Sequence, residues 1–361
     1  MKKLKSIVYW LLARGGVRRA FEATQRSLSG VVSGGRIRSH AYHSLNPIAF
    51  SREQQAVMAG RHSYYQALHH TDRSNVALRR NVHRIEKGLV MQPPRPIFAL
   101  DYIEETLDFF EATIHRIRAG EPVDQGELEW ASAVLGAYFR RVTDAAVKHH
   151  AERFAFASAE LGESATGEAS PEPFLRETSP LAVTFENLQQ LAMRRRSVRF
   201  FQQRRVPRDL VDRALEIARQ SPTACNRMPY EFRFFDDPEM VPKVASVPFG
   251  SAGYAENIPM VAVVVGRLDS YFSPRDRHAV YIDSSLAVMG FLYGLETLGL
   301  SSSIINWPDF EPLEIKMQKL LGLELHERPM MLIAIGFADT TVPVPFSKKK
   351  ELDSFRSFNR M

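Results

Sequence analysis

Hydrophobic residues recur at helical spacing through the first half of the chain. In residues 52–90 they outline two helices, "REQQAVMAGRHSYYQALHH" and "SNVALRRNVHRIEKGL", and Ser74 is the expected N-cap of the second. The prolines of "MQPPRP" end this pair, because proline cannot donate the backbone hydrogen bond that a helix interior requires. "LDYIEETLDFFEATIHRIRAG" and "QGELEWASAVLGAYFRRVTDAAVKHHAERF" predict two further helices.

After residue 183 the pattern changes to alternating helices and strands. "TFENLQQLAMRRRS" and "PRDLVDRALEIARQS" predict helices, and "YEFRFFDD" alternates as a strand does. "MVAVVVGRL" and "PMMLIAIGFAD" are continuous apolar runs, typical of strands buried on both faces. "DSSLAVMGFLYGLETLGL" is apolar almost all round, as a central helix would be. There are too few strands for a doubly wound sheet, so we predict a compact three-layer α+β domain.

A change in composition separates the two halves. Residues 155–182 are rich in Ala, Ser, Glu, Gly and Pro and have no sustained periodicity, which favours a linker. The predicted organisation is a basic, partly amphipathic arm (1–50), a helical region (51–154), the linker and an α+β domain (183–361).

The positive charge is concentrated at the start of the chain. The net charge is +6 over 361 residues, but the first 40 residues hold nine Lys or Arg against one acid, so the rest is nearly neutral. The segment "LKSIVYWLLARGG" is too short to span a bilayer and reads as an amphipathic helix. We expect residues 1–30 to contact an anionic membrane surface, with no nucleic-acid partner. The alternative is that this apolar face docks on its own domain or on a partner subunit.

Cysteine and histidine usage exclude several kinds of site. The single cysteine, Cys225, excludes an intrachain disulfide and fits a reducing, cytoplasmic location, peripheral at the membrane if the arm binds lipid. The histidine pairs in "LHH" and "KHH" lack carboxylates in a metal-ligand pattern, so no metal is expected. No residue is identified as a catalytic acid, base or nucleophile.

Five motifs follow one another in the second half of the chain. They are "RRRSVRFF", "SPTACNRMPYEF", "AENIPMVAVVVG", "LETLGLSSSIINW" and "HERPMMLIAIGFAD" followed by "VPFSKKK". Together they resemble the FMN-dependent nitroreductase family over roughly residues 183–350. The resemblance implies a nitroreductase-like FMN-binding fold preceded by a mainly helical N-terminal region.

The basic motif is suited to bind the phosphate of such a cofactor, because guanidinium groups bind phosphate oxygens bidentately. The resemblance implies that Arg195, Ser197 and Arg199 approach the phosphate and ribityl groups. At helical spacing Arg195 and Arg199 would lie four apart on one face, beside Ser197. Lys348 or Lys349 would close over the phosphate, or both would belong to a solvated charged run.

Three further residues are implied to lie near the flavin ring. Asn226 matches an asparagine that hydrogen-bonds the ring edge, although asparagine is also common in turns. The backbone N–H of Asn306 is expected to point at the flavin N5 atom. Trp307 stands where many relatives have glycine, and it either covers the flavin, narrows the substrate slot or packs in the core. Met228 and Tyr230 replace a glutamine and a tryptophan of the family motif.

The resemblance predicts an oxidoreductase that passes electrons from NAD(P)H to an oxidised small-molecule acceptor by a ping-pong mechanism. It also implies a homodimer with each flavin at the subunit interface, and the apolar helix 283–300 suits such an interface. Two alternatives stay open. One is a specialised flavin enzyme acting on a carbohydrate or biosynthetic intermediate. The other is a non-catalytic module that binds membrane or partners through residues 1–180.

Overall fold

The computed structural model describes residues 23–24, 27–45, 50–67, 74–159, 161 and 171–360. The apolar segment of the predicted membrane arm lies outside these residues, as does much of the predicted linker. The chain divides into two units, one of residues 1–55 with 309–312 and one of all other residues. No helix in the described ranges is both long and apolar enough to cross a bilayer.

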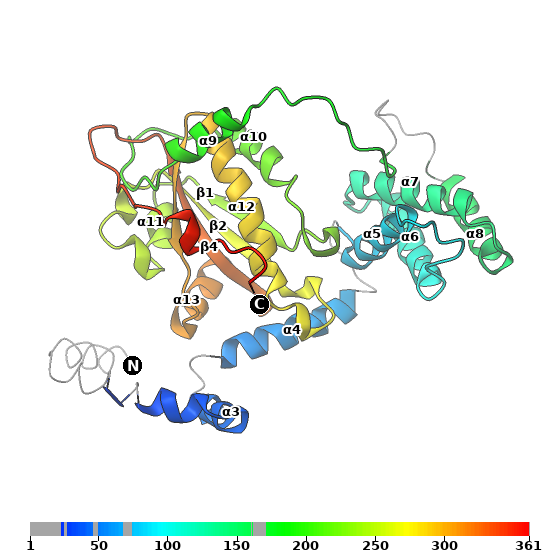
Figure 1. Cartoon of the computed structure of the whole chain (residues 1–361), viewed down its shortest axis with the longest axis horizontal. Helices are drawn as coiled ribbons and strands as arrows, with labels where there is room; N and C mark the ends of the chain where they lie inside the picture. Colours follow the sequence, from blue (N-terminus) through cyan, green and yellow to red (C-terminus); the bar gives the residue numbers. More distant parts are fainter. Residues whose placement is uncertain are drawn as a thin grey trace. The chain divides into compact units, whose positions relative to one another are not determined.

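Helices make up most of the described chain (Figure 1). In chain order they are α3 (Arg36–Leu45), α4 (Ser51–Ala67), α5 (Val76–Leu89), α6 (Ile103–Arg118), α7 (Gln125–Arg141), α8 (Lys148–Ala159), α9 (Phe185–Arg194), α10 (Arg208–Ala218), α11 (Met240–Ala245), α12 (Ala279–Thr297) and α13 (Glu311–Leu321). The apolar run predicted to form a central helix is α12.

The strands form one antiparallel sheet in the order β1-β2-β4-β3. Their bounds are β1 (Tyr230–Phe235), β2 (Met260–Arg267), β3 (Ser301–Asn306) and β4 (Glu327–Gly336). Three of them coincide with predicted strands. Strand β3 was not predicted from the apolar pattern. It is an edge strand that begins with three serines, so it carries no long apolar run.

The two faces of the sheet carry separate helical layers, as the sequence predicts. Met260, Ala262 and Val264 of β2 point into a core with α10 and α12. Val261 and Val263 point the opposite way, into a core with α11 and α13. Because side chains alternate along a strand, burial on both faces requires an apolar residue at every position. The three-layer α+β fold is therefore confirmed.

The helical region before residue 160 has a hydrophobic core of its own, built from α5, α6, α7 and α8. The N-cap of α5 is Asn75 and not the predicted Ser74. The Asn75 Oδ1 atom accepts hydrogen bonds from the Ala77 and Leu78 backbone N–H groups at 3.1 and 3.0 Å. Ser74 instead donates its hydroxyl to the Glu127 carboxylate at 2.5 Å.

The single long helix predicted from residue 125 to residue 154 is interrupted. Helix α7 ends at Arg141, and α8 begins at Lys148. Between them the Asp144 carboxylate accepts a hydrogen bond from the Ala146 N–H at 2.8 Å. Such a cap starts a new turn of helix, so the aspartate sets the interruption.

Candidate flavin site and polar cavity

The motif "RRRSVRFF" is an extended segment and not a helix. Helix α9 ends at Arg194, the first residue of the motif, and Arg195 has φ −57° and ψ 121°. Ser197 then forms a parallel β-bridge with Ser302 of β3. The predicted helical face shared by Arg195 and Arg199 is therefore wrong. In extended backbone alternate residues share a side, so the spacing of Arg195, Ser197 and Arg199 still suits one surface.

This segment lines a cavity of about 200 Å³. The lining residues are Ser197, Val198, Arg199, Phe200 and the four residues 342–345. No described residue of this lining carries a carboxylate. Arg195 and Arg199 form no ion pair within the described chain, whereas Arg194 pairs with Glu296 at 3.1 Å. Arg199 hydrogen-bonds the Tyr254 side chain but has no ion-pair partner, and a serine hydroxyl with such guanidinium groups fits the phosphate of FMN.

The lysines of the C-terminal tail are exposed and do not line this cavity. Lys348 forms an ion pair with Glu351 at 3.3 Å, which is the local contact expected of a solvated run. The tail approaches the basic motif through Arg196, whose guanidinium donates to the Phe346 carbonyl at 3.5 Å. Phosphate contact by Lys348 or Lys349 stays a prediction.

The loop that contains Asn226 has an unusual backbone. Cys225, Asn226 and Met228 have φ angles of 55°, 52° and 49°, in the left-handed region that residues with a Cβ rarely adopt. Such conformations persist only where their surroundings hold them, and they concentrate at functional sites. Here the Ala224 N–H donates to the Asp283 carboxylate at 2.9 Å, which fixes the start of the turn.

A second contact holds this loop from helix α5. The Arg79 Nε atom donates to the Asn226 carbonyl at 2.9 Å, and its Nη1 atom pairs with Glu127 at 3.1 Å. Glu127 is buried and also accepts from the Asn75 N–H at 2.7 Å. Burial raises the pKa of Glu127, and its hydrogen bonds and Arg79 offset that effect only in part. The helical region therefore takes part in shaping the predicted flavin loop.

Asn306 and Trp307 follow one another at the end of β3. Asn306 is exposed and pairs with Met331 of β4. The Trp307 side chain is buried in the core and donates its indole N–H to Glu314 at 2.5 Å. Glu314 in turn pairs with Arg328 at 3.2 Å, and each of these two side chains is 3% exposed. Of the three alternatives for Trp307, the structure shows its side chain packed in the core. Contact between the Asn306 backbone and the flavin stays a prediction.

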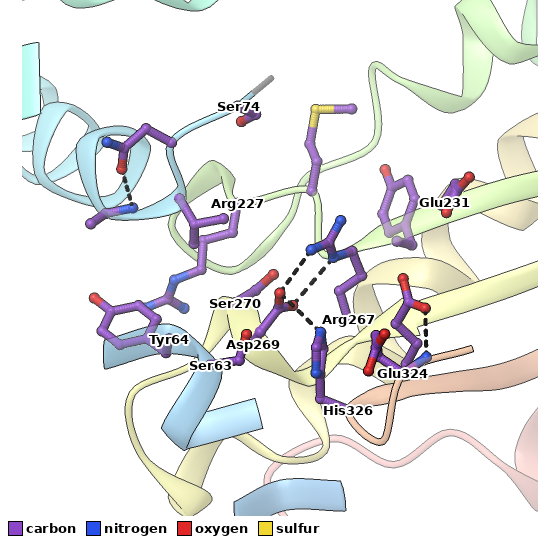
Figure 2. Close-up of a pocket in the computed structure, with 16 residues that line it drawn as sticks. Ser63, Tyr64, Ser74, Arg227, Glu231, Arg267, Asp269, Ser270, Glu324 and His326 are labelled. Carbon is purple, nitrogen blue, oxygen red and sulfur yellow. Dashed lines mark hydrogen bonds and ion pairs between the residues drawn. The ribbon is translucent and has the colours of Figure 1, made fainter. Parts of the chain in front are cut away.

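A second cavity in the described chain was not predicted. It has a volume of about 570 Å³ and lies beside the Asn226 loop (Figure 2). Its lining is mostly polar and comes from α4, the start of α5, the Arg227–Glu231 segment and the ends of β2 and β4: Ser63, Tyr64, Ser74, Asn75, Val76, Ala77, Arg227, Met228, Tyr230, Glu231, Arg267, Asp269, Ser270, Glu324, His326 and Glu327.

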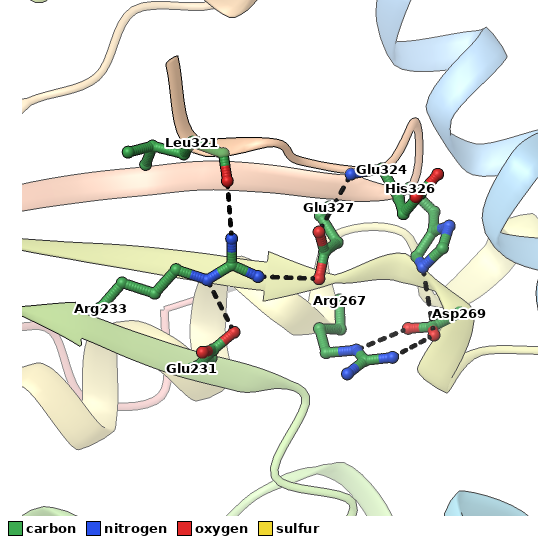
Figure 3. Close-up of polar contacts among 8 residues, drawn as sticks. All are labelled: Glu231, Arg233, Arg267, Asp269, Leu321, Glu324, His326 and Glu327. Atoms are coloured by element: carbon green, nitrogen blue, oxygen red, sulfur yellow. Dashed lines mark hydrogen bonds and ion pairs between the residues drawn. The ribbon is translucent and has the colours of Figure 1, made fainter. Parts of the chain in front are cut away.

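A charged cluster forms one wall of this cavity (Figure 3). The Asp269 carboxylate accepts from Arg267 at 2.8 Å and lies 3.3 Å from the His326 Nε2 atom. Burial alone would raise the pKa of Asp269, but these donors outweigh it and lower the pKa to about 2. Burial would lower the pKa of His326, yet the bond to Asp269 raises it. His326 was not predicted to belong to a site.

The opposite part of the lining is acidic. Arg233 reaches the Glu231 carboxylate at 2.9 Å and the Glu327 carboxylate at 3.1 Å, so one guanidinium faces two acids. Glu324 is exposed at the same end (Figures 2 and 3). Within the described residues, no group of three or more His, Cys, Asp or Glu side chains has the geometry of a metal site.

Residues 192–252 and 243–337 match the model of the Nitroreductase family. A protein of Methanothermobacter thermautotrophicus named as an NADH dehydrogenase/NAD(P)H nitroreductase is 29% identical over 147 residues, which are 40% of this chain and 73% of that protein. This part of the chain, referred to below as the nitroreductase-family domain, is similar to the Nitroreductase family. The match supports an oxidoreductase in general.

More distant similarities cover the same half of the chain. Human iodotyrosine deiodinase 1 is 22% identical over 192 residues, which are 45% of this chain and 65% of that enzyme. The solved structure of an FMN-dependent nitroreductase from Clostridium difficile is 19% identical and has a TM-score of 0.42, covering 47% of this chain and 98% of the other. The helical region before the nitroreductase-family domain is outside the family match.

Proposed function

We propose that the chain is an FMN-dependent oxidoreductase that passes electrons from NAD(P)H to an oxidised small-molecule acceptor by a ping-pong mechanism. The observation that carries the proposal is the cavity beside the basic motif. It offers a serine hydroxyl and the Arg199 guanidinium, with Arg195 on the same segment and no carboxylate among the described lining residues. Arg195, Ser197 and Arg199 lie inside the region that matches the Nitroreductase family, and residues 342–345 of the cavity lining follow that region.

The proposed roles of the residues are binding and orientation. Arg195 and Arg199 would neutralise the FMN phosphate, and the Ser197 hydroxyl would add a neutral donor. The constrained loop would present the Asn226 amide to the edge of the flavin ring, since an amide both donates and accepts. When bound, FMN supplies the ring that takes electrons from NAD(P)H and gives them to the acceptor.

The proposal is tested by FMN affinity in two matched double variants. Arg195→Ala with Arg199→Ala should weaken FMN binding at least about 100-fold, because hydrogen bonds to charged groups contribute about 1.5–3 kcal/mol each. Arg194→Ala with Arg196→Ala removes the same charge from the same segment and should change affinity little. Equal losses in both pairs, measured by flavin fluorescence titration, would show general charge attraction and not a phosphate site.

Catalysis is tested separately from binding. Purified protein should be yellow, and anaerobic NADH or NADPH should bleach its flavin absorption in one step before any acceptor is added. Protein that binds FMN but is reduced by neither nucleotide would favour the non-catalytic alternative. Reduction without turnover of simple nitro compounds or quinones would favour the specialised flavin enzyme.

We also propose that the nitroreductase-family domain forms a homodimer. On α12, Ile282, Leu286 and Met289 are 60%, 45% and 36% exposed, and their spacing places them on one face of the helix. A second copy would bury this face. Analytical ultracentrifugation should give a dimer at micromolar concentration, and Leu286→Lys should give a folded monomer. A wild-type monomer with stoichiometric FMN would refute the shared site.

A further inference from the structure

The polar cavity of about 570 Å³ is lined by a buried cation that has no direct ion-pair partner among the described residues. Arg227 is 5% exposed and forms no ion pair within the described chain. Its Nε atom is buried and has no hydrogen-bond partner, and its Nη1 atom makes only a long bond of 3.4 Å to the Ala224 carbonyl. Buried charges in proteins are normally paired, because removing an ion from water is costly.

The neighbours of Arg227 do not replace a counter-ion. Its guanidinium lies over the Tyr271 ring at 5.2 Å, which holds the side chain in place by a weaker cation–π contact. The charge of Asp283 also acts on Arg227, but this carboxylate accepts the Ala224 N–H and lies 3.5 Å from the Tyr271 hydroxyl. An anion in the cavity would therefore satisfy a charge that the protein itself leaves unpaired.

The cavity has two chemically different ends (Figure 2). Arg227 and Ser270 lie on one side with Tyr64, and the Asp269 carboxylate between them and the far side is already bonded to two cationic groups. Glu231 and Glu324 lie on the far side. A ligand that fits both ends carries a negative group toward Arg227 and hydrogen-bond donors toward the two glutamates.

We propose that this cavity binds a small, hydroxylated organic anion, a carboxylate or a phosphate ester, and that Arg227 pairs with its negative group. The proposal does not rest on the proposed flavin chemistry. Its residues differ from those of the cavity beside Arg199, and its measurement is ligand binding and not turnover.

Three small molecules test whether the cavity binds a carboxylate, a phosphate ester or neither. D-Glycerate supplies a carboxylate with hydroxyls, sn-glycerol 3-phosphate supplies a phosphate ester, and glycerol is the neutral control. Calorimetric titrations at low ionic strength, with excess FMN present to fill the predicted phosphate site, should show that at least one anion binds more tightly than glycerol. If neither anion binds more tightly than glycerol, the proposal is wrong.

Substitutions then locate the bound anion. Arg227→Gln should weaken binding of the anion about 10- to 100-fold, as expected for a lost charge-assisted hydrogen bond. Arg213→Gln removes an exposed arginine of α10 that does not line the cavity, and it should leave binding unchanged. Unchanged affinity in Arg227→Gln, or loss of binding in the Arg195→Ala with Arg199→Ala variant, would place the anion elsewhere.

A second variant keeps the test decisive if Arg227→Gln does not fold. Ser63→Phe adds a ring to α4 at the cavity wall and leaves Arg227 in place. It should reduce anion affinity about tenfold, because the added ring takes up part of the space that the anion would occupy. Wild-type affinity in this variant would show that the ligand does not occupy the cavity.

Discussion

Replacing Glu314 with glutamine should destabilise the nitroreductase-family domain more than most single substitutions. Glu314 accepts the Trp307 indole N–H at 2.5 Å and pairs with Arg328 at 3.2 Å, where both charged side chains are 3% exposed. Glutamine keeps the shape of the side chain but removes the charge opposite Arg328. Removing one partner of a buried ion pair costs about 3–5 kcal/mol. We therefore expect the free energy of unfolding to fall by about that amount.

Urea unfolding followed by circular dichroism and tryptophan fluorescence measures this change. A Glu314→Met, Arg328→Met double variant should recover much of the loss, because removing both charges leaves neither one buried alone. Glu216→Gln is the control, since its ion pair with Arg219 is exposed and such pairs contribute little. If Glu314→Gln unfolds with a free energy within about 1 kcal/mol of wild type, the buried-pair reasoning is wrong.

Three other predictions concern helix packing, pH and the N-terminal arm. On α12, Gly294→Ala should lower the free energy of unfolding by about 1–3 kcal/mol, because the new Cβ would lie 2.9 Å from the Ala214 Cα. The Cβ of Gly290→Ala meets nothing closer than 3.5 Å, so thermal unfolding should show that this variant is more stable by up to about 1 kcal/mol. The pKa of Asp269 is lowered from 3.8 to about 2, which stabilises the fold by about 2.5 kcal/mol above pH 4. In acid titrations of stability, wild type should lose this stabilisation as the pH falls through 2, and Asp269→Asn should show no such loss. Full-length protein should float with anionic vesicles at low salt, and protein lacking residues 1–30 should not; equal flotation would remove the membrane proposal.

The sequence predicted the fold best where burial is complete on both faces of an element. Strands β2 and β4 are continuous apolar runs because each packs against two helical layers. Strand β3 was missed because its first half is serine and its pairing to β4 depends on long-range contacts. The segment after α9 was read as helix, since Arg and Ser carry no signal for the β-bridge that extends it.

The candidate site was predictable only where residues are close in the sequence. The motif around Arg199 is local, and its cavity contains two of the three predicted residues. Arg227 and His326 lie inside two of the quoted motifs, but the motifs assign neither a role, and both meet Asp269 only in the folded chain. A lone arginine inside a proline-containing loop gives no sign that it will be buried without a partner.

The hydrogen bond from Arg79 to the Asn226 carbonyl couples ordering of the Asn226 loop to the position of helix α5. Whatever immobilises the Asn226 loop must also stabilise the position of α5 in which Arg79 makes this bond, and thermodynamic reciprocity requires that α5 stabilise the loop to the same extent. Ligand binding at the loop should therefore slow amide exchange in α5, and Arg79→Met should abolish that protection. The helical region would then help to retain whatever ligand the Asn226 loop binds.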